Sequence, residues 1–125
     1  MILDTNAVSA LFVGDLALER LLSSAPRHEL PVIVIGEYRY GLARSKSRRT
    51  LLPLLEELIA QSTILEVEIA TAAVYAVVRE DLRARGTPIS ENDIWIGALA
   101  VQHGLDVASR DTDFDYITGL RRRTW

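Results

Sequence analysis

Four carboxylate residues stand where the sequence could place an active site. Asp4, Glu37 and Asp111 each come at most two residues after an apolar segment of strand length. Asp93 differs, because it stands in the first turn of a helix expected to begin near Ser90. Since the carboxyl ends of parallel strands meet at one edge of a sheet, the three strand-end acids are expected to lie together there.

Several carboxylates in one partly buried pocket repel one another, so a cation is needed to keep them all ionised. No cysteine occurs in the chain and no histidine stands at these positions, so every ligand would be an oxygen atom. Oxygen ligands favour Mg²⁺ or Mn²⁺ over zinc. Such a site is typical of phosphodiester hydrolysis, in which one or two metal ions activate a water and stabilise the leaving oxygen.

Each acid also has an ordinary structural explanation. The alternatives are a capping box over residues 90–93 for Asp93, a helix cap for Asp4, a favourable helix dipole for Glu37 and a solvated turn for Asp111. What favours the active-site interpretation is their joint occurrence, because three separate strands would deliver acids to one edge of the sheet.

The elements that would carry these acids alternate between strands and helices. Strands are expected at residues 2–3, 30–35, 64–67 and 107–109. Helices are expected at 7–24 with a break near Gly14, at 37–45, 51–61, 69–85 and 90–104, with a helical turn at 112–119. Gly97 lies one turn beyond Asp93 and is expected to let that helix approach the sheet closely. This order predicts a single α/β domain over residues 1–125 with a mostly parallel sheet covered on both faces.

The bulk composition is that of an ordinary globular protein without disulfides. The chain has 125 residues, of which 49% are apolar and 25% charged. No signal peptide or membrane span is visible, and the lack of cysteine fits a reducing cytoplasm. The net charge of −3 argues against nucleic-acid binding, but with the four candidate ligands set aside 13 acidic residues face 14 basic ones.

The basic residues are clustered rather than spread along the chain. One group follows Glu37 and comprises Arg39, Arg44, Lys46, Arg48 and Arg49. Arg110 stands next to Asp111, and residues 121–123 are all arginine. We expect the first group and Arg110 to contact an RNA backbone. The alternative interpretation is a solvated helix face and a solvated tail.

Four short segments resemble those of PIN-domain nucleases, in particular the VapC-type toxins of type II toxin–antitoxin systems. They occur in the family's order and span nearly the whole chain. The segments are MILDTN at 1–6, IGEYRYG at 35–41, NDIWIGALA at 92–100 and SRDTDF at 109–114. The chain departs from many relatives at Val34, where they have a threonine, and its C-terminus is short for a final strand.

The resemblance implies a three-layer α/β/α fold with a central sheet of four to five strands, and cleavage of RNA with Mg²⁺ or Mn²⁺. Asp4, Glu37, Asp93 and Asp111 take the places of the family's acidic quartet as catalytic and metal-binding residues. The residues that would support them are Asn6, Ser109 and Asp113. The resemblance also implies a homodimer, and an antitoxin partner that inserts a basic or aromatic side chain into the acidic pocket.

Three other functions remain open at this point. A stand-alone PIN nuclease for RNA processing would use the same residues. A phospho-acceptor signalling domain would need a paired acid at the first strand and a lysine near the phosphate, but the only lysine, Lys46, lies in a basic run far from a strand end. A related phosphatase of the haloacid-dehalogenase type would need Asp-x-Asp at the first strand, but position 6 is asparagine. A binding module without catalytic activity is the third alternative.

Overall fold

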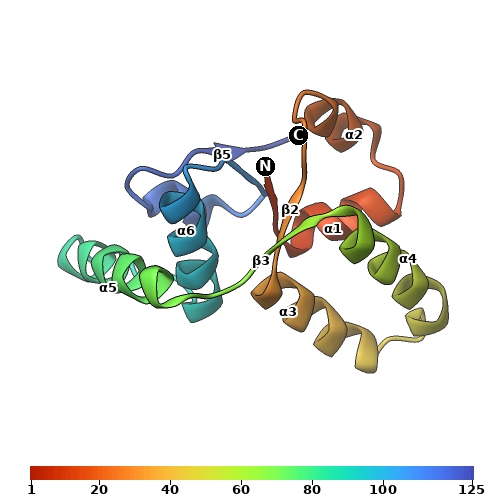
Figure 1. The fold of residues 1–125 in the computed structure, drawn as a ribbon, viewed down its shortest axis with the longest axis horizontal. Coiled ribbons are helices and arrows are strands. Elements are labelled where there is room, and N and C mark those ends of the chain that lie inside the picture. The colour runs from red at the N-terminus through yellow and green to blue at the C-terminus, as the bar shows by residue number, and fades with distance from the viewer.

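Five short parallel strands form the centre of the structure, a computed structural model that describes residues 1–125 (Figure 1). The strands lie side by side in the order β3-β2-β1-β4-β5, and every neighbouring pair is parallel. Their bounds are β1 Ile2–Leu3, β2 Glu29–Pro31, β3 Thr63–Leu65, β4 Val107–Ala108 and β5 Arg122–Arg123. Asp4 and Asp111 therefore follow β1 and β4, which are neighbouring strands in the interior of the sheet.

Helices cover both faces of this sheet. In Figure 1, α5 and α6 lie on one side of the strands, and the first four helices lie on the other. The bounds are α1 Thr5–Phe12, α2 Leu16–Ser23, α3 Val32–Ala43, α4 Arg48–Gln61, α5 Ile69–Ala84 and α6 Glu91–His103, with a short 3₁₀ helix, η1, at Thr112–Tyr116. None of the helices has both the length and the apolar character needed to span a membrane.

The predicted α/β class is confirmed, and so is a rudimentary last strand. All four residues of β1 and β4 are completely buried, as expected for parallel strands covered on both faces. They belong to one core cluster of 21 buried residues that also contains Phe114 of η1. The two residues of β5 pair with β4 at the edge of the sheet. The core thus fixes the strand ends from which the site is built.

The strand predicted at residues 30–35 is wrong for most of its length. Only Glu29–Pro31 forms β2, and α3 begins at Val32. The β-branched run favours a strand locally, but Val34 is fully buried and Leu42 almost so, with Tyr38 packed between them against the core. This spacing of four residues is helical. Glu37 therefore stands in the second turn of α3 and not directly after a strand.

Candidate active site

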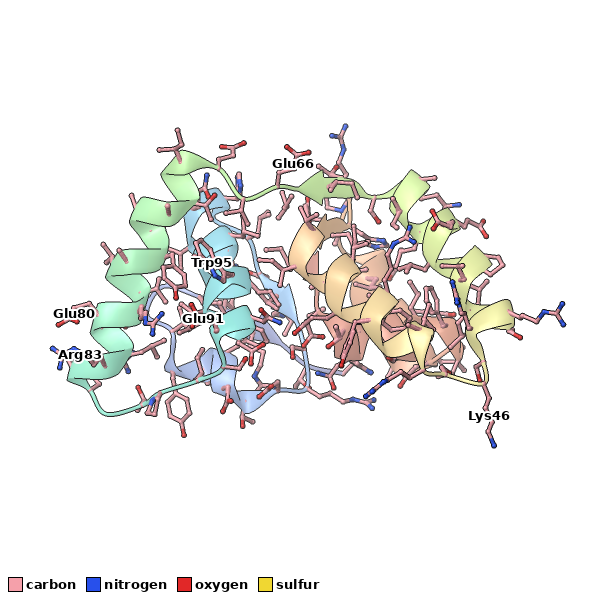
Figure 2. All side chains as sticks on the ribbon, turned by 90° about the horizontal axis from the view of Figure 1, so that it is seen from below. Lys46, Glu66, Glu80, Arg83, Glu91 and Trp95 are labelled. Atoms are coloured by element: carbon pink, nitrogen blue, oxygen red, sulfur yellow. The ribbon has the colours of Figure 1, made fainter.

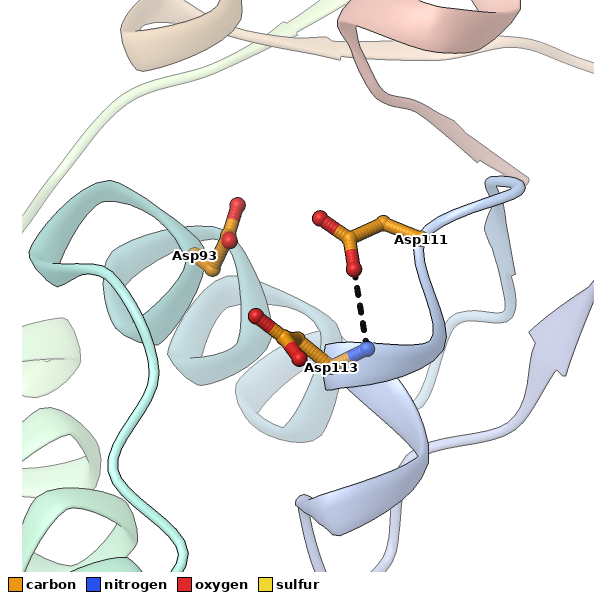
Figure 3. Close-up of side chains that lie close together, drawn as sticks. All are labelled: Asp93, Asp111 and Asp113. Atoms are coloured by element: carbon orange, nitrogen blue, oxygen red, sulfur yellow. Dashed lines mark hydrogen bonds between the residues drawn. The ribbon is translucent and has the colours of Figure 1, made fainter.

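Three aspartates bring their carboxylates together at the carboxyl edge of the sheet. Oxygen atoms of Asp93, Asp111 and Asp113 all lie within 4.8 Å of one another, and all three residues are partly buried. Figure 3 shows the side chains pointing toward a common centre, Asp93 from α6 and the other two from the chain that follows β4. Segments far apart in the sequence thus build one acidic cluster.

Local hydrogen bonds hold each member of the cluster in place. Ser90 is the N-cap of α6, and its hydroxyl accepts from the backbone N–H of Asp93 at 3.2 Å. Asp111 is the N-cap of η1, and its Oδ1 accepts from the backbone N–H of Asp113 at 2.9 Å (Figure 3). The predicted helix cap at Ser90 is therefore present, and Asp93 belongs to the cluster as well.

A close contact between α6 and the segment after η1 brings the two halves of the cluster together. A Cβ atom built on Gly97 would lie 2.2 Å from Cδ1 of Ile117. The glycine therefore admits the Ile117 side chain, which is almost completely buried. The sheet was the expected neighbour of Gly97, but the close approach is made to Ile117.

Asp4 lies apart from the three-aspartate cluster and is almost completely buried, with 3% exposure. Its Oδ1 accepts from the backbone N–H of Ala7 at 3.0 Å, which caps α1. Its Oδ2 accepts from Nδ2 of Asn6 at 3.1 Å and from the hydroxyl of Ser109. Asn6 and Ser109 thus support Asp4 directly, and Asp4 is both a helix cap and a buried carboxylate.

Ser109 joins Asp4 to the cluster. Its side chain is fully buried directly after β4. While the hydroxyl donates to Asp4, it accepts from the backbone N–H of Asp111 at 2.9 Å. One hydroxyl therefore fixes the separation between the acid that follows β1 and the acid that follows β4.

Glu37, on α3, is linked to the first turn of α6, which carries Asp93. Its Oε1 accepts from Nδ2 of Asn92 at 2.7 Å. Its negative charge contributes to raising the pKa of Asp93, which places it in the same electrostatic field. The structure thus positions all four predicted acids around the strand ends, but it groups Asp113 rather than Asp4 or Glu37 with Asp93 and Asp111.

The environment raises the pKa of two of these acids. Burial is the main cause for Asp93, with the charges of Asp111, Glu37 and Asp113 adding to it against the opposing hydrogen bond from Ser90. Burial also raises the pKa of Asp4, although the hydrogen bonds from Ser109, Ala7 and Asn6 oppose it. The site therefore concentrates negative charge that is costly to maintain.

The donor set fits a hard divalent cation. All the clustered side chains offer carboxylate oxygen, the ligand type that Mg²⁺ and Mn²⁺ prefer. A cation there would remove the repulsion that raises the pKa of Asp93. The residues present therefore fit the predicted metal.

The predicted RNA-contact residues lie on and between α3 and α4 or beside the site. Lys46 projects away from the body of the molecule at the α3–α4 connection (Figure 2). Among the arginines of the group that follows Glu37, Arg39 forms an ion pair with Glu56. The other three, Arg44, Arg48 and Arg49, form no ion pair. Arg110 pairs with Asp15 at 2.9 Å, and its guanidinium lies 4.7 Å from the centre of the Trp125 ring.

Two residues beside the site were not predicted from the sequence. Asn92 binds Glu37, and Arg122 donates to the backbone oxygen of Ser109 at 3.2 Å. Arg122 is also held by Asp115 through two bonds of 2.8 Å. The run of arginines at 121–123 marked a charged tail, but no sequence signal showed that Arg122 turns inward to β4.

Known proteins match this chain over nearly its whole length. The PIN domain family matches residues 1–120. Ribonuclease VapC5 of Mycobacterium tuberculosis is 31% identical over 121 residues, covering 94% of this chain and 87% of that protein. Toxin FitB of Neisseria gonorrhoeae is 32% identical over 129 residues, covering 90% of this chain and 88% of that protein.

The fold agrees with these sequence matches. The crystal structure of DNA-bound VapBC from Salmonella typhimurium has a TM-score of 0.87 at 26% identity, covering 99% of this chain and 96% of that chain. The likeness thus covers the fold as well as the sequence. The chain belongs to the PIN-domain family, and within it is similar to the VapC-type ribonucleases.

Proposed function

We propose that this chain is an endoribonuclease that requires Mg²⁺ or Mn²⁺, and that it acts in the cytoplasm as the toxin of a toxin–antitoxin pair. Residues 1–125 form its single nuclease domain. The observation that carries the proposal is the convergence of the Asp93, Asp111 and Asp113 carboxylates within 4.8 Å. A bound cation would offset the mutual repulsion of these carboxylates.

The acids are proposed to have different roles, according to their positions in the fold. Asp93, Asp111 and Asp113 would hold the cation, Glu37 would add its negative charge beside Asp93, and Asp4 would support the cluster through Ser109. The cation supplies Lewis acidity to the phosphate and lowers the pKa of a water molecule. Ser109 keeps Asp4 oriented, so that one Asp4 oxygen stays on α1 while the other faces Asn6 and Ser109.

The RNA is proposed to approach over the basic residues of α3 and α4. Arg44, Arg48 and Arg49 have no acidic partner in the ion pairs of the structure, so their charges are available to phosphates. Arg39 and Arg110 would have to exchange a carboxylate partner for a phosphate. Replacing Arg48 and Arg49 should thus weaken RNA binding in a salt-dependent way.

The toxin role is supported by the proteins that this chain resembles. One relative is named Toxin FitB, and a similar solved structure is that of DNA-bound VapBC. We infer that an antitoxin covers the acidic site until it is removed, and that two copies of this chain form a homodimer. Induced expression should then arrest growth, and co-expression of the adjacent antitoxin gene should relieve the arrest. Induction without growth arrest would favour a stand-alone processing nuclease.

The nuclease activity is tested with the purified chain and total cellular RNA. Treatment with EDTA should abolish cleavage, and added Mn²⁺ or Mg²⁺ should restore it, with discrete cleavage ends when the products are mapped. Ca²⁺ serves as a matched divalent control, since it takes more ligands in a looser geometry than Mg²⁺. Cleavage that persists in EDTA, or no cleavage with any of these ions, would overturn the proposal.

A further inference from the structure

Asn92 makes the only side-chain hydrogen bond between α3 and α6. Its Nδ2 donates to Oε1 of Glu37 at 2.7 Å, across 55 positions of sequence. The other side-chain bond made by α3 is the Arg39–Glu56 pair, which leads to α4 and away from the acidic cluster. The geometry of Glu37 relative to the cluster therefore depends on this one amide.

We propose that Asn92 is a positioning residue that holds the Glu37 carboxylate toward the cation site formed by Asp93, Asp111 and Asp113. The inference rests on the proposed function. Asn92 and Asp93 are neighbours in the first turn of α6, which the Ser90 cap holds in place. The first turn of α6 thus provides both Asp93, a member of the cluster, and the Asn92 amide that holds Glu37.

The amide is suited to this position by its charge as well as its shape. A carboxylate is an acceptor only, so the Asn92 amide nitrogen must face Glu37. A neutral donor orients the carboxylate without bringing a positive charge that would compete with a cation. An acid in its place would repel Glu37 and add to the charges that already raise the pKa of Asp93.

The position also allows a clean substitution. Asn92 is exposed at the second residue of α6, and its side chain makes no hydrogen bond other than the one to Glu37. Alanine is a good helix former, so Asn92→Ala should leave the fold intact. Gln61 offers a matched control, because its Nε2 donates to Glu57 at 3.1 Å in another exposed amide–carboxylate pair on α4.

The first measurement needs no metal and no activity. In the metal-free protein, the side-chain NH₂ resonances of Asn92 should shift when Glu37 is changed to alanine, and those of Gln61 should not. Mn²⁺ binding followed by electron paramagnetic resonance should then be weakened roughly three- to tenfold by Asn92→Ala, the size expected for losing one solvent-exposed hydrogen bond of typical strength. Gln61→Ala should leave it unchanged.

The second measurement is a double-mutant cycle on cleavage. Asn92→Ala should raise the Mn²⁺ concentration for half-maximal cleavage by the same factor, while leaving the rate at saturating Mn²⁺ within about twofold. If Asn92 acts through Glu37, adding Asn92→Ala to Glu37→Ala should change nothing further.

Each outcome separates this inference from the proposed function. Additive effects, unmoved Asn92 resonances or unchanged Mn²⁺ affinity would overturn the positioning role, even with full RNA cleavage by the wild type. Absence of RNA cleavage by the wild type would overturn the function, while the resonance and Mn²⁺-binding results would still decide whether Asn92 holds Glu37.

Discussion

The Ser109 hydroxyl donates a hydrogen bond to Oδ2 of Asp4, joining two residues that lie 105 positions apart in the chain. The bond is buried, and it links the end of β1 to the end of β4 at the centre of the sheet. The same hydroxyl accepts from the backbone N–H of Asp111. The acidic site is therefore built on the buried centre of the sheet, and Asp111 is attached to it through Ser109.

Replacing Ser109 with alanine should separate Asp4 from this support. The change leaves a buried carboxylate short of one donor, which costs about 1–3 kcal/mol of stability. Cleavage should fall about 10- to 100-fold, as is usual for residues that orient metal-site acids. Thermal unfolding and initial cleavage rates measure the two effects. Ser24→Ala is the control, because the exposed Ser24 hydroxyl donates only to the backbone oxygen of Leu21. An equal loss of cleavage rate in both variants would contradict the role of Ser109.

Replacing Asp93 with asparagine should abolish activity without unfolding the protein. The change removes one charge from the three-carboxylate cluster and keeps the side-chain shape, so cleavage should drop about 100-fold or more. Asp4→Asn should also remove cleavage. Glu80→Gln is a suitable control because Glu80 forms an exposed pair with Arg83 on α5, at the outer edge of the molecule (Figure 2). Full activity in Asp93→Asn or Asp4→Asn would remove that acid from the site.

The contact of Gly97 with Ile117 should appear as an energetic coupling. Alanine at position 97 would place its Cβ 2.2 Å from Cδ1 of Ile117, whereas the next two atoms of that side chain lie 3.6 and 3.7 Å away. Ile117→Val removes Cδ1 alone, at a cost of about 1 kcal/mol in the wild type. In the Gly97→Ala background the same change should cost less or stabilise, with a coupling of about 1 kcal/mol or more in chemical denaturation. Simple additivity would show that this contact does not set the distance between α6 and η1.

The raised pKa of Asp93 predicts how stability depends on pH in EDTA. Burial and the neighbouring carboxylates raise the folded-state pKa of Asp93 above its unfolded value, so the folded chain binds that proton more tightly. The free energy of unfolding should thus decrease as the pH rises from about 4 through the raised pKa. The measure is the difference in Tm between wild type and Asp93→Asn.

That comparison isolates Asp93 from the other acids. Asp4 has a raised pKa in both proteins, so its contribution cancels in the difference. The pKa values of Glu80, Asp81 and Asp115 are lowered by arginine partners, so their contributions to the stability of the protein are lost only at more acidic pH. Wild type should lose stability relative to Asp93→Asn as the pH rises, and saturating Mg²⁺ should reverse this. If the difference in Tm between the two proteins stays constant with pH, the ionised Asp93 carboxylate does not destabilise the fold.

Strand-end acids were predictable because their signals are local. A short apolar segment followed within a few residues by an acid indicates the carboxyl end of a parallel strand, and this holds for Asp4 directly after β1 and for Asp111 three residues after β4. The Ser90 cap and the αL glycine at position 104 likewise bound α6 as expected. These features depend on neighbours within a few residues.

Features that depend on packing could not be predicted in this way. The run at 30–35 is β-branched, but burial of Val34 and Leu42 on one face makes it helical, so Glu37 lies in the second turn of α3 and not at the start of the helix. Only the fold brings Asn92 to Glu37 and Ile117 to Gly97. Asp113 joins the cluster because η1 turns directly after its Asp111 cap, a local geometry that the acid-rich sequence did not distinguish from a solvated turn.

Anomalous diffraction from crystals grown or soaked with Mn²⁺ tests the central claim most directly. A cation held by the cluster should give an anomalous peak within about 2.0–2.5 Å of carboxylate oxygens from Asp93, Asp111 and Asp113, the range for hard divalent ions. The peak should vanish in Asp93→Asn crystals treated identically. Ordered carboxylates at full Mn²⁺ concentration with no peak between them would contradict the account.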